Sequence, residues 1–459
     1  MDATQIIKAA EVALPGWLAK QRWFSSGDSA PQSATVVDQT WIVDGVPGLL
    51  WTLMDVDSTS VYQVPIGVRE KEHIGPTLLG FPHAHVCEAE IDGKTCILYD
   101  GMIDSPLARA MFKVVFDGQQ EAATVRPVGG EQSNTSLVFD NRTIVKFFRR
   151  LYKGRNPDLE VSIALTEAEF AHIAPVSATW QRGEWDLAVA QPYLFDGSDG
   201  WNMAMNSVRD FLRGDFVASS SPQGSPNKIV DDFEDPSKAG GNFGNEAHRL
   251  GRVTAELHLA MAKQFDTDAY SASALADSLM RDFDSLTDVE RKSMQNLIDR
   301  LREVPDSMAG RAIRIHGDYH FGQTLRSTSG WYVFDFEGEP ARPLHERRIL
   351  TSPLKDVAGM LRSVQYAGAT GLSEQTETAQ DDLAARAESW ESYNCGRFRE
   401  GYFSVDGIET LMPSNQETRD LLLRGFEVEK ALYELAYERA YRPDWVSIPH
   451  GAIRRLLAA

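Results

Sequence analysis

Residues 315–323 read I-H-G-D-Y-H-F-G-Q, and residues 331–337 read W-Y-V-F-D-F-E. In this stretch, Asp318 lies five residues before the amide of Gln323 and seventeen residues before Asp335. Kinase-like phosphotransferases space a catalytic base and their metal ligands in this way. An Asp on a loop can accept the proton of an attacking hydroxyl, while an amide oxygen one turn later faces a metal on the nucleotide phosphates. We therefore interpret Asp318 as the base and Gln323 as an Mg²⁺ ligand.

Asp335 is interpreted as the second Mg²⁺ ligand. It lies inside an apolar, β-rich run typical of a buried strand, where a charge is costly unless something binds it. Mg²⁺ that bridges phosphates suits such a carboxylate. His316, two residues before the base, is expected to brace the loop through hydrogen bonds. An isolated H-G-D is a weak signal, because Gly-Asp pairs are common in turns, so the inference of a phosphotransferase rests on the joint pattern.

The nucleotide-binding half is expected upstream of this stretch. Residues 128–136 form a small, polar turn between predicted strands, and Asp140-Asn141 predicts a hairpin before a strand that carries Lys146. Lys146 is interpreted as the phosphate-contacting lysine, and Glu160, early in a helix that begins at 156–158, as its partner. The turn is neither G-x-G-x-x-G nor a Walker A motif, so its backbone N–H groups and polar side chains would contact the phosphates. Those side chains are Gln132, Ser133, Asn134, Thr135 and Ser136.

The strand at residues 187–194 is interpreted as the last strand and hinge of a kinase N-lobe. Adenine is therefore expected beside Gln191, Tyr193 and Leu194.

Taken together, these motifs resemble actinobacterial maltokinase, within the aminoglycoside-phosphotransferase-like and eukaryotic-kinase-like superfamily. The resemblance runs from about residue 125 to the end of the sequence, and Q-R-W-F at 21–24 resembles the start of the family. The motifs that carry it are E-Q-S-N-T-S at 131–136, K-F-F-R-R at 146–150, N-P-D-L-E at 156–160, H-G-D at 316–318, D-F-E-G-E-P at 335–340, E-R-R at 346–348, S-P-L-K-D-V-A-G-M-L-R-S at 352–363 and R-P-D-W at 442–445.

The resemblance implies ATP- and Mg²⁺-dependent phosphorylation of maltose at its anomeric hydroxyl, giving maltose 1-phosphate for α-glucan and glycogen synthesis. It also implies an α+β, bilobal kinase-like fold with an added N-terminal α+β cap. The predicted parts are a cap at 1–90, a strand-rich intermediate N-lobe at 91–198 and a helical C-terminal lobe at 199–459. In one motif the chain departs from the family, since Gln365 stands where the family pattern has an acidic residue.

A stripe of side chains on one helix is a candidate sugar platform. Phe426, Lys430, Tyr433 and Tyr437 recur at i, i+4, i+7 and i+11, so they share one helical face. Aromatic rings beside hydrogen-bonding groups suit the C–H faces and hydroxyls of sugars, although core packing is the ordinary explanation of such a stripe. The residues assigned to the substrate side are His316, Glu337, Arg362, Lys430, Tyr433 and Tyr437.

Composition favours a cytoplasmic enzyme. A net charge of -20 over 459 residues argues against nucleic-acid binding, which needs a basic face. Such acidity repels nucleotide phosphates unless Mg²⁺ and local cations, Lys146 and Arg149, neutralise them. The three cysteines fit no zinc spacing and are expected to be reduced thiols. Neither a secretory leader nor an apolar run of about 20 residues is evident, so no membrane association is expected.

Several alternatives stay open from the sequence. The substrate could be another small hydroxylated molecule, such as glucosamine, methylthioribose or an aminoglycoside, and a cationic one would need a carboxylate-rich pocket. A nucleotide-binding pseudokinase is less consistent with the joint presence of Lys146, Asp318, Gln323 and Asp335. Fusion to a glucan-synthesising enzyme is not visible, since the sequence contains no second catalytic module, while association with such an enzyme stays open. The cap could serve regulation, thermal stabilisation or partner docking.

Overall fold

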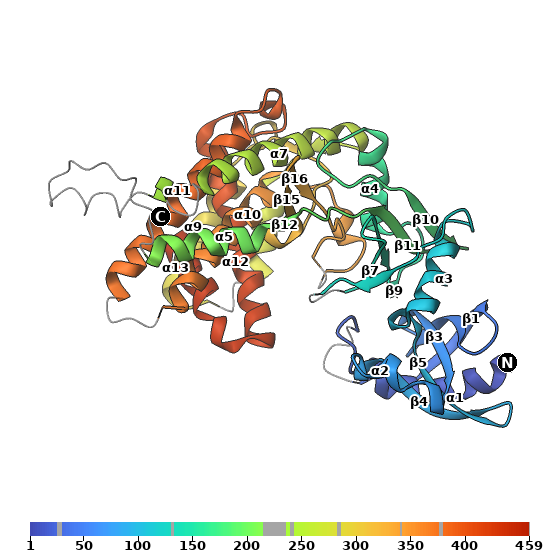
Figure 1. Cartoon of the computed structure of the whole chain (residues 1–459). Coiled ribbons are helices and arrows are strands. Elements are labelled where there is room, and N and C mark those ends of the chain that lie inside the picture. The colour runs from blue at the N-terminus through green and yellow to red at the C-terminus, as the bar shows by residue number, and fades with distance from the viewer. Residues whose placement is uncertain are drawn as a thin grey trace, which may run out of the picture. The chain divides into compact units, whose positions relative to one another are not determined.

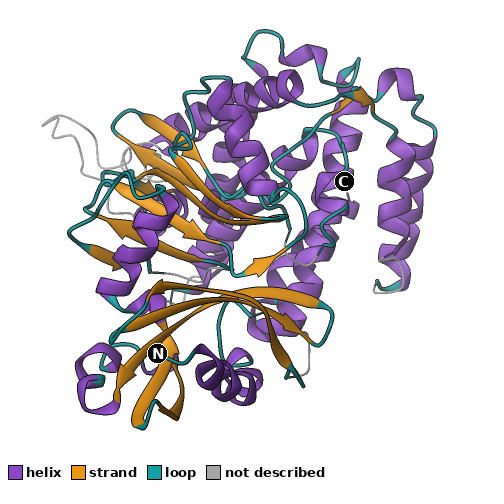
Figure 2. Ribbon diagram, turned by 90° about the vertical axis from the view of Figure 1, so that its right-hand side faces the viewer, coloured by secondary structure: helices purple, strands orange, loops and turns teal. Residues whose placement is uncertain are grey.

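The computed structural model describes residues 1–24, 30–129, 133–213, 236–238, 243–281, 286–339, 342–375 and 380–458 (Figure 1). The chain forms two compact units, Met1–Ile163 with Ala174–Phe195 and Ala164–Ile173 with Asp196–Ala459. The first unit holds the two large antiparallel sheets and the second is mainly helical, which confirms the predicted α+β class (Figure 2). The three-part division at residues 90 and 198 stays a prediction.

The first sheet occupies the N-terminal part of the first unit. Its strands are antiparallel in the order β1-β2-β3-β5-β4, and β9 pairs with β3 off this path. They are β1 (Ala34–Val43), β2 (Gly48–Val56), β3 (Ser60–Glu70), β4 (His85–Ile91), β5 (Lys94–Asp100) and β9 (Arg150–Leu151). Helix α1 (Ala3–Leu18) begins at Asp2, whose side chain accepts the N–H of Thr4, and packs its apolar stripe on the sheet. A short α2 (Gly75–Leu78) lies between β3 and β4.

The second sheet carries the predicted nucleotide-binding residues. It is antiparallel in the order β10-β11-β8-β7-β6. Its strands are β6 (Val125–Pro127), β7 (Thr135–Phe139), β8 (Thr143–Phe147), β10 (Ala178–Arg182) and β11 (Trp185–Pro192), flanked by α3 (Ser105–Val115) and α4 (Pro157–Glu167). Asp140 and Asn141, between β7 and β8, have φ of 51° and 53°. Positive φ at both central residues is the geometry of a type I′ turn, so the predicted hairpin is present.

Helices build most of the second unit. They are α5 (Gly200–Arg213), α7 (Phe243–Gln264), α8 (Ala272–Arg281), α9 (Asp288–Arg302), α10 (Leu354–Ser373), α11 (Gln380–Phe403), α12 (Gln416–Tyr441) and α13 (Ser447–Ala458). Short strands accompany them: β12 (Ser198–Asp199), β15 (Thr324–Ser327) and β16 (Gly330–Val333) form one sheet, while β13 (Asp268–Ala269) pairs with β14 (Arg311–Ala312). α10 packs against α5, α11 and α12 and is largely buried, so it forms the centre of this unit.

One local expectation was wrong. Asp335 was expected inside a strand, but β16 ends at Val333 and Asp335 lies in the turn that follows, with φ of 67°. Asp tolerates this left-handed conformation better than most residues, because its short polar side chain can form local hydrogen bonds. The turn places the carboxylate beyond the end of the strand.

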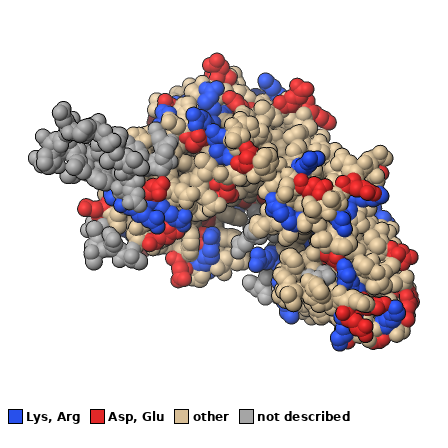
Figure 3. All heavy atoms as spheres, in the orientation of Figure 1, with Lys and Arg blue, Asp and Glu red and all other residues tan. Residues whose placement is uncertain are grey.

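The surface charges and the helices relate to the expectations on nucleic-acid binding and on membrane association. On the face that Figure 3 shows, Lys and Arg lie interspersed with Asp and Glu. Within the described part of the chain, no helix combines the length and the apolar character needed to cross a membrane.

Candidate active site

A carboxylate of α10 binds the backbone of the loop that carries Asp318. Asp356, which is only 2% exposed, accepts the backbone N–H of His316 at 2.8 Å and that of Gly317 at 3.0 Å. Gly317 has φ of 86°, a conformation that glycine adopts without strain. Burial opposes ionisation of Asp356, but its bonds with His258 and with the Gly317 N–H lower its pKa below the ordinary value. A buried carboxylate therefore determines the position of the loop backbone.

His316 uses both ring nitrogens within the loop. Nε2 lies 3.0 Å from the Phe334 carbonyl oxygen, and Nδ1 lies 3.3 Å from the backbone N of Asp318. A carbonyl oxygen can only accept, so Nε2 carries the proton and Nδ1 accepts from Asp318. These contacts match the expected bracing role, and a direct contact between His316 and substrate stays a prediction.

The carboxylate of Asp318 faces an ammonium group. Lys430 Nζ lies 3.0 Å from Asp318 Oδ1 and 2.9 Å from Glu339 Oε1. Burial would lower the pKa of Lys430, but Asp318 and Glu339 raise it well above its usual value. Burial would likewise raise the pKa of Glu339, but Lys430 and Lys355 lower it to about 2. Lys430 therefore stays charged at neutral pH.

A small pocket lies on the inner side of this ion pair. Its lining includes Gly317, Glu339, Lys355, Glu429 and Lys430, and it offers about 10 Å³, enough for about one water molecule. Lys355 Nζ lies 2.9 Å from Glu429 Oε2, so the charges of the pocket are matched within the protein.

The predicted metal ligands lie together in the second unit. Gln323 Nε2 donates to Asp335 Oδ2 at 3.2 Å, and carboxylate oxygens of Asp335 and Glu337 lie within 4.8 Å of each other. Carboxylate and amide oxygens are the donors that Mg²⁺ prefers, so the donor set fits this ion. Glu337 was assigned to the substrate, but its carboxylate lies near the proposed metal ligand Asp335. The two acids of the D-F-E motif, only two residues apart in the sequence, were the available signal that Glu337 lies near Asp335.

Lys146 is paired within the first unit. It lies on β8, and its Nζ is 2.9 Å from Asp158 Oδ2 in the first turn of α4. Sequence reasoning missed Asp158 and chose Glu160, two residues later on the same helix. The signal for Asp158 was the N-P-D helix start, since the side chain of Asn156 caps the N–H of Asp158 at 2.9 Å. The pairing of Glu160 with Lys146 stays a prediction.

The predicted phosphate loop is partly described. Gln132 lies outside the described residues. Asn134 donates to Ser133 Oγ at 3.1 Å, and Ser136 pairs with Lys146 across the β7–β8 ladder. Thr135 begins β7. Polar side chains and the lysine are thus gathered at one end of the sheet, while their contact with nucleotide stays a prediction.

Arg149 differs from its sequence interpretation as a phosphate-neutralising cation. Its side chain is 1% exposed and forms an ion pair with Asp100 at 2.5 Å. The charge is therefore already matched inside the protein. Asp100, on a strand far away in the sequence, could not be recognised as its partner from any local pattern.

The predicted adenine region is the end of β11 and the residues after it. Gln191 Nε2 donates to the Ala174 carbonyl at 2.7 Å, and the backbone N of Tyr193 donates to the Arg142 carbonyl at 2.7 Å. Leu194 follows Tyr193 in the chain. Hydrogen bonds of this kind hold the segment in place, and its role in adenine binding stays a prediction.

The helical stripe divides into three environments. Phe426 is 3% exposed and packs against Tyr270, so it belongs to the core. The ammonium of Lys430 lies 4.8 Å from the Tyr433 ring centroid, which places Tyr433 beside the Asp318 ion pair. Tyr437 is 41% exposed and contacts Tyr441. Contact of Lys430, Tyr433 and Tyr437 with sugar stays a prediction.

Arg362 was also assigned to the substrate. It is 1% exposed, and its Nη2 lies 2.7 Å from Glu434 Oε2, while Nη1 donates to Gln365. Gln365 in turn donates to Glu427 at 3.3 Å. The substituted position of the family pattern therefore belongs to a partly buried polar network, and a substrate contact of Arg362 stays a prediction.

The chain is similar to several known proteins. Residues 17–104 match the family model described as the maltokinase N-terminal cap domain. The N-terminal part of the chain is therefore similar to the maltokinase cap. The chain is 24% identical over 384 residues to a glucosamine kinase of Mycolicibacterium smegmatis, covering 80% of this chain and 88% of that protein. It is 25% identical over 361 residues to a glucosamine kinase of Streptacidiphilus jiangxiensis, covering 74% and 75%.

Solved structures show the same fold. A glucosamine kinase in crystal form B superposes with a TM-score of 0.64 at 18% identity and covers 99% of both chains. A glucosamine kinase in complex with glucosamine, ADP and inorganic phosphate superposes with a TM-score of 0.61 at 18% identity, covering 98% of this chain and 99% of that chain. The chain therefore has the predicted kinase-like α+β fold with an N-terminal cap.

Proposed function

We propose that the protein is an ATP-dependent sugar kinase that phosphorylates the anomeric hydroxyl of maltose and yields maltose 1-phosphate for α-glucan and glycogen synthesis. The observation that carries the proposal is the loop of Asp318, whose backbone is bonded to Asp356 and whose carboxylate faces Lys430. The maltokinase-type cap and the glucosamine kinases among the relatives support a sugar as acceptor.

In the proposed reaction, Asp318 accepts the proton of the sugar hydroxyl. Lys430 holds Oδ1 of this carboxylate, so the proton would pass to Oδ2, and the hydroxyl would be aligned with the phosphoryl group. Lys146 would contact the phosphates and stabilise the charge that develops during transfer. Mg²⁺, held by Gln323 and Asp335, would neutralise the phosphate oxygens when bound.

A glucosamine kinase is the second candidate. The named relatives favour it.

A phosphate-transfer assay separates these two candidates. The protein is incubated with ATP, Mg²⁺ and maltose, glucose, glucosamine or kanamycin, and NMR identifies the phosphorylated position. Maltose 1-phosphate as the dominant product is expected. Glucosamine as the preferred acceptor would replace maltose with the second candidate, and Gln365→Glu would then be the first variant to profile. Absence of transfer to every acceptor, with ATP still bound, would favour a nucleotide-binding pseudokinase.

A further inference from the structure

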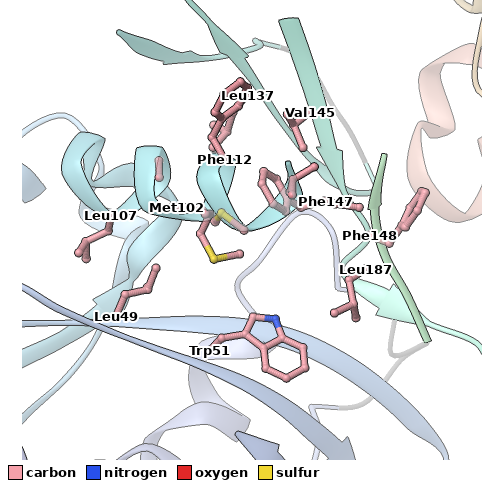
Figure 4. Packing of buried hydrophobic residues seen from close by; sticks show 14 of the residues in the cluster. Leu49, Trp51, Met102, Leu107, Phe112, Leu137, Val145, Phe147, Phe148 and Leu187 are labelled. Atoms are coloured by element: carbon pink, nitrogen blue, oxygen red, sulfur yellow. The ribbon is translucent and has the colours of Figure 1, made fainter. Parts of the chain in front are cut away.

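The cap and the second sheet share one hydrophobic core. Leu49 and Trp51 of β2 belong to the same buried cluster as Phe112 of α3, Leu137 of β7 and Phe147 of β8 (Figure 4). In Figure 4 these side chains point into the space between the two sheets. A continuous core resists independent motion of its two sides, because interiors are close-packed.

A buried glutamine ties the backbones of the two sheets together. Gln63 of β3 is fully buried, and its Nε2 donates to the carbonyl oxygens of Phe148 at 2.5 Å and of Leu187 at 2.6 Å. Its Oε1 accepts the indole N–H of Trp51 at 3.0 Å. Unsatisfied buried carbonyls are costly, so these bonds specify one arrangement of cap and sheet.

Arg149 extends this connection to the predicted phosphate loop. On the side of the cap, whose family model spans residues 17–104, its guanidinium pairs with Asp100 at 2.5 Å and lies over the Trp23 ring at 4.7 Å from the centroid. On the loop side, its Nε donates to Thr135 Oγ1 at 2.7 Å, and its backbone N donates to Asn134 Oδ1 at 3.1 Å. The buried side chain of Arg149 thus contacts both the cap and Thr135, while the backbone of Arg149 contacts Asn134.

The orientation of Arg149 depends on the cap. A buried guanidinium needs a paired carboxylate, and Asp100 is itself held because its Oδ1 accepts the N–H of Met102 at 3.1 Å. The planar guanidinium has a fixed fork of donors, so the direction of the Asp100 bond also sets the direction of Nε toward Thr135.

We propose that Arg149 is a positioning residue through which the N-terminal cap holds Asn134 and Thr135 in the geometry that binds ATP phosphates. This inference rests on the proposed function, since it takes residues 133–136 as the phosphate loop. The cap is then part of the nucleotide site, acting through Asp100 rather than through contact with ATP.

The chain offers a matched control for this connection. Arg182 of β10 pairs with Asp38 of β1 through two bonds of 2.6 Å and 2.8 Å, which also join the cap sheet to the second sheet. None of the described contacts of this pair involves the predicted phosphate loop. Asp38→Asn therefore tests loss of a cap contact alone.

The experiment compares full-length wild type with Asp100→Asn, Arg149→Lys and Asp38→Asn. ATP affinity is measured by calorimetry without sugar, and KM values for ATP and for the accepted sugar are measured separately. Asp100→Asn and Arg149→Lys should each weaken ATP binding by about tenfold, as expected for loss of roughly one oriented hydrogen bond, while KM for sugar stays within about twofold. Asp38→Asn should leave both values within about twofold of wild type.

Arg149→Lys guards against misfolding, because lysine keeps a charge beside Asp100 but lacks the second oriented donor. Unchanged ATP affinity in folded Arg149→Lys, or an equal loss in Asp38→Asn, would overturn the positioning role. A wild-type protein that binds no ATP would overturn the proposed function first, and this is visible before any variant is compared.

Discussion

The ammonium of Lys430 lies 3.0 Å from the carboxylate of Asp318, although 112 residues separate them in the chain. Helix α12 supplies the lysine and the H-G-D loop supplies the aspartate. Glu339 shares the ammonium at 2.9 Å, so the charge of Lys430 is balanced by two acids in a largely buried setting. Such a pair keeps the Asp318 side chain in one orientation, which is what a base needs before a hydroxyl arrives.

Replacement of Lys430 by methionine should lower kcat about a hundredfold, because Asp318 loses the contact that orients it. Steady-state kinetics with ATP and the accepted sugar provide the measurement. Lys355→Met is the matched control, since it removes the other ammonium of the same pocket without a described contact to Asp318. Equal losses in the two variants would contradict a specific role for Lys430.

Replacement of Asp318 by asparagine should lower kcat by roughly 10²–10⁴-fold, because the proton acceptor is lost while the shape is kept. Thermal melting and ATP binding should stay near wild type, since the loop backbone is held by Asp356 and not by Asp318. Single-turnover transfer measures the chemical step directly. Near wild-type turnover would remove Asp318 as the base.

Replacement of Asp335 by asparagine should raise the Mg²⁺ concentration needed for half-maximal activity by about tenfold or more, since a ligand charge is lost. A metal titration at saturating ATP tests this expectation. Glu337→Gln should shift the same titration in the same direction but less, because its carboxylate lies near Asp335 without being a proposed ligand. A titration that Asp335→Asn leaves unchanged would rule out the ligand assignment.

Replacement of Glu427 by glutamine should change the pH dependence of stability. Burial raises the pKa of Glu427 from its ordinary 4.5 to about 7, against the effect of Arg362. The folded protein thus holds this proton more tightly than the unfolded chain does, and stability falls as the pH rises from about 4.5 to about 7. Glutamine does not ionise, so it removes this loss, and it can still accept the hydrogen bond from Gln365. The change in the free energy of unfolding caused by the substitution should therefore be more favourable at pH 8 than at pH 4 by about 1–3 kcal/mol.

Urea denaturation at both pH values measures this change in the free energy of unfolding. Glu417→Gln, an exposed acid on the same helix, is the control and should show no such difference. The same result for both variants would show that burial of Glu427 has no influence on its proton.

Local sequence patterns predicted the parts of the site that lie close together in the chain. The H-G-D loop, the following amide and Asp335 are within a short stretch, so their spacing alone indicated a phosphotransferase. The hairpin at Asp140-Asn141 was also predictable, because few residues adopt positive φ at both positions of a tight turn. The helical spacing predicted that Lys430 and Tyr433 share one face of α12, and the structure shows that this face lies beside Asp318.

Long-range partners were not predictable from the sequence. Three acids of the structure had no distinguishing feature in their local sequence. They are Asp356, which bonds to the H-G-D loop, Glu339, which pairs with Lys430, and Asp100, which pairs with Arg149. The stripe on α12 likewise contained no indication that Phe426 would be core while Tyr437 would be exposed.

The sequence by itself therefore indicated a phosphotransferase, through side chains whose spacing along the chain equals their spacing in a loop or a helix. Only the tertiary structure decided which charges are paired and which are buried. The physical reason is that a carboxylate pairs with whatever cation the packed core brings near it, and the core is specified by hydrophobic contacts between distant segments.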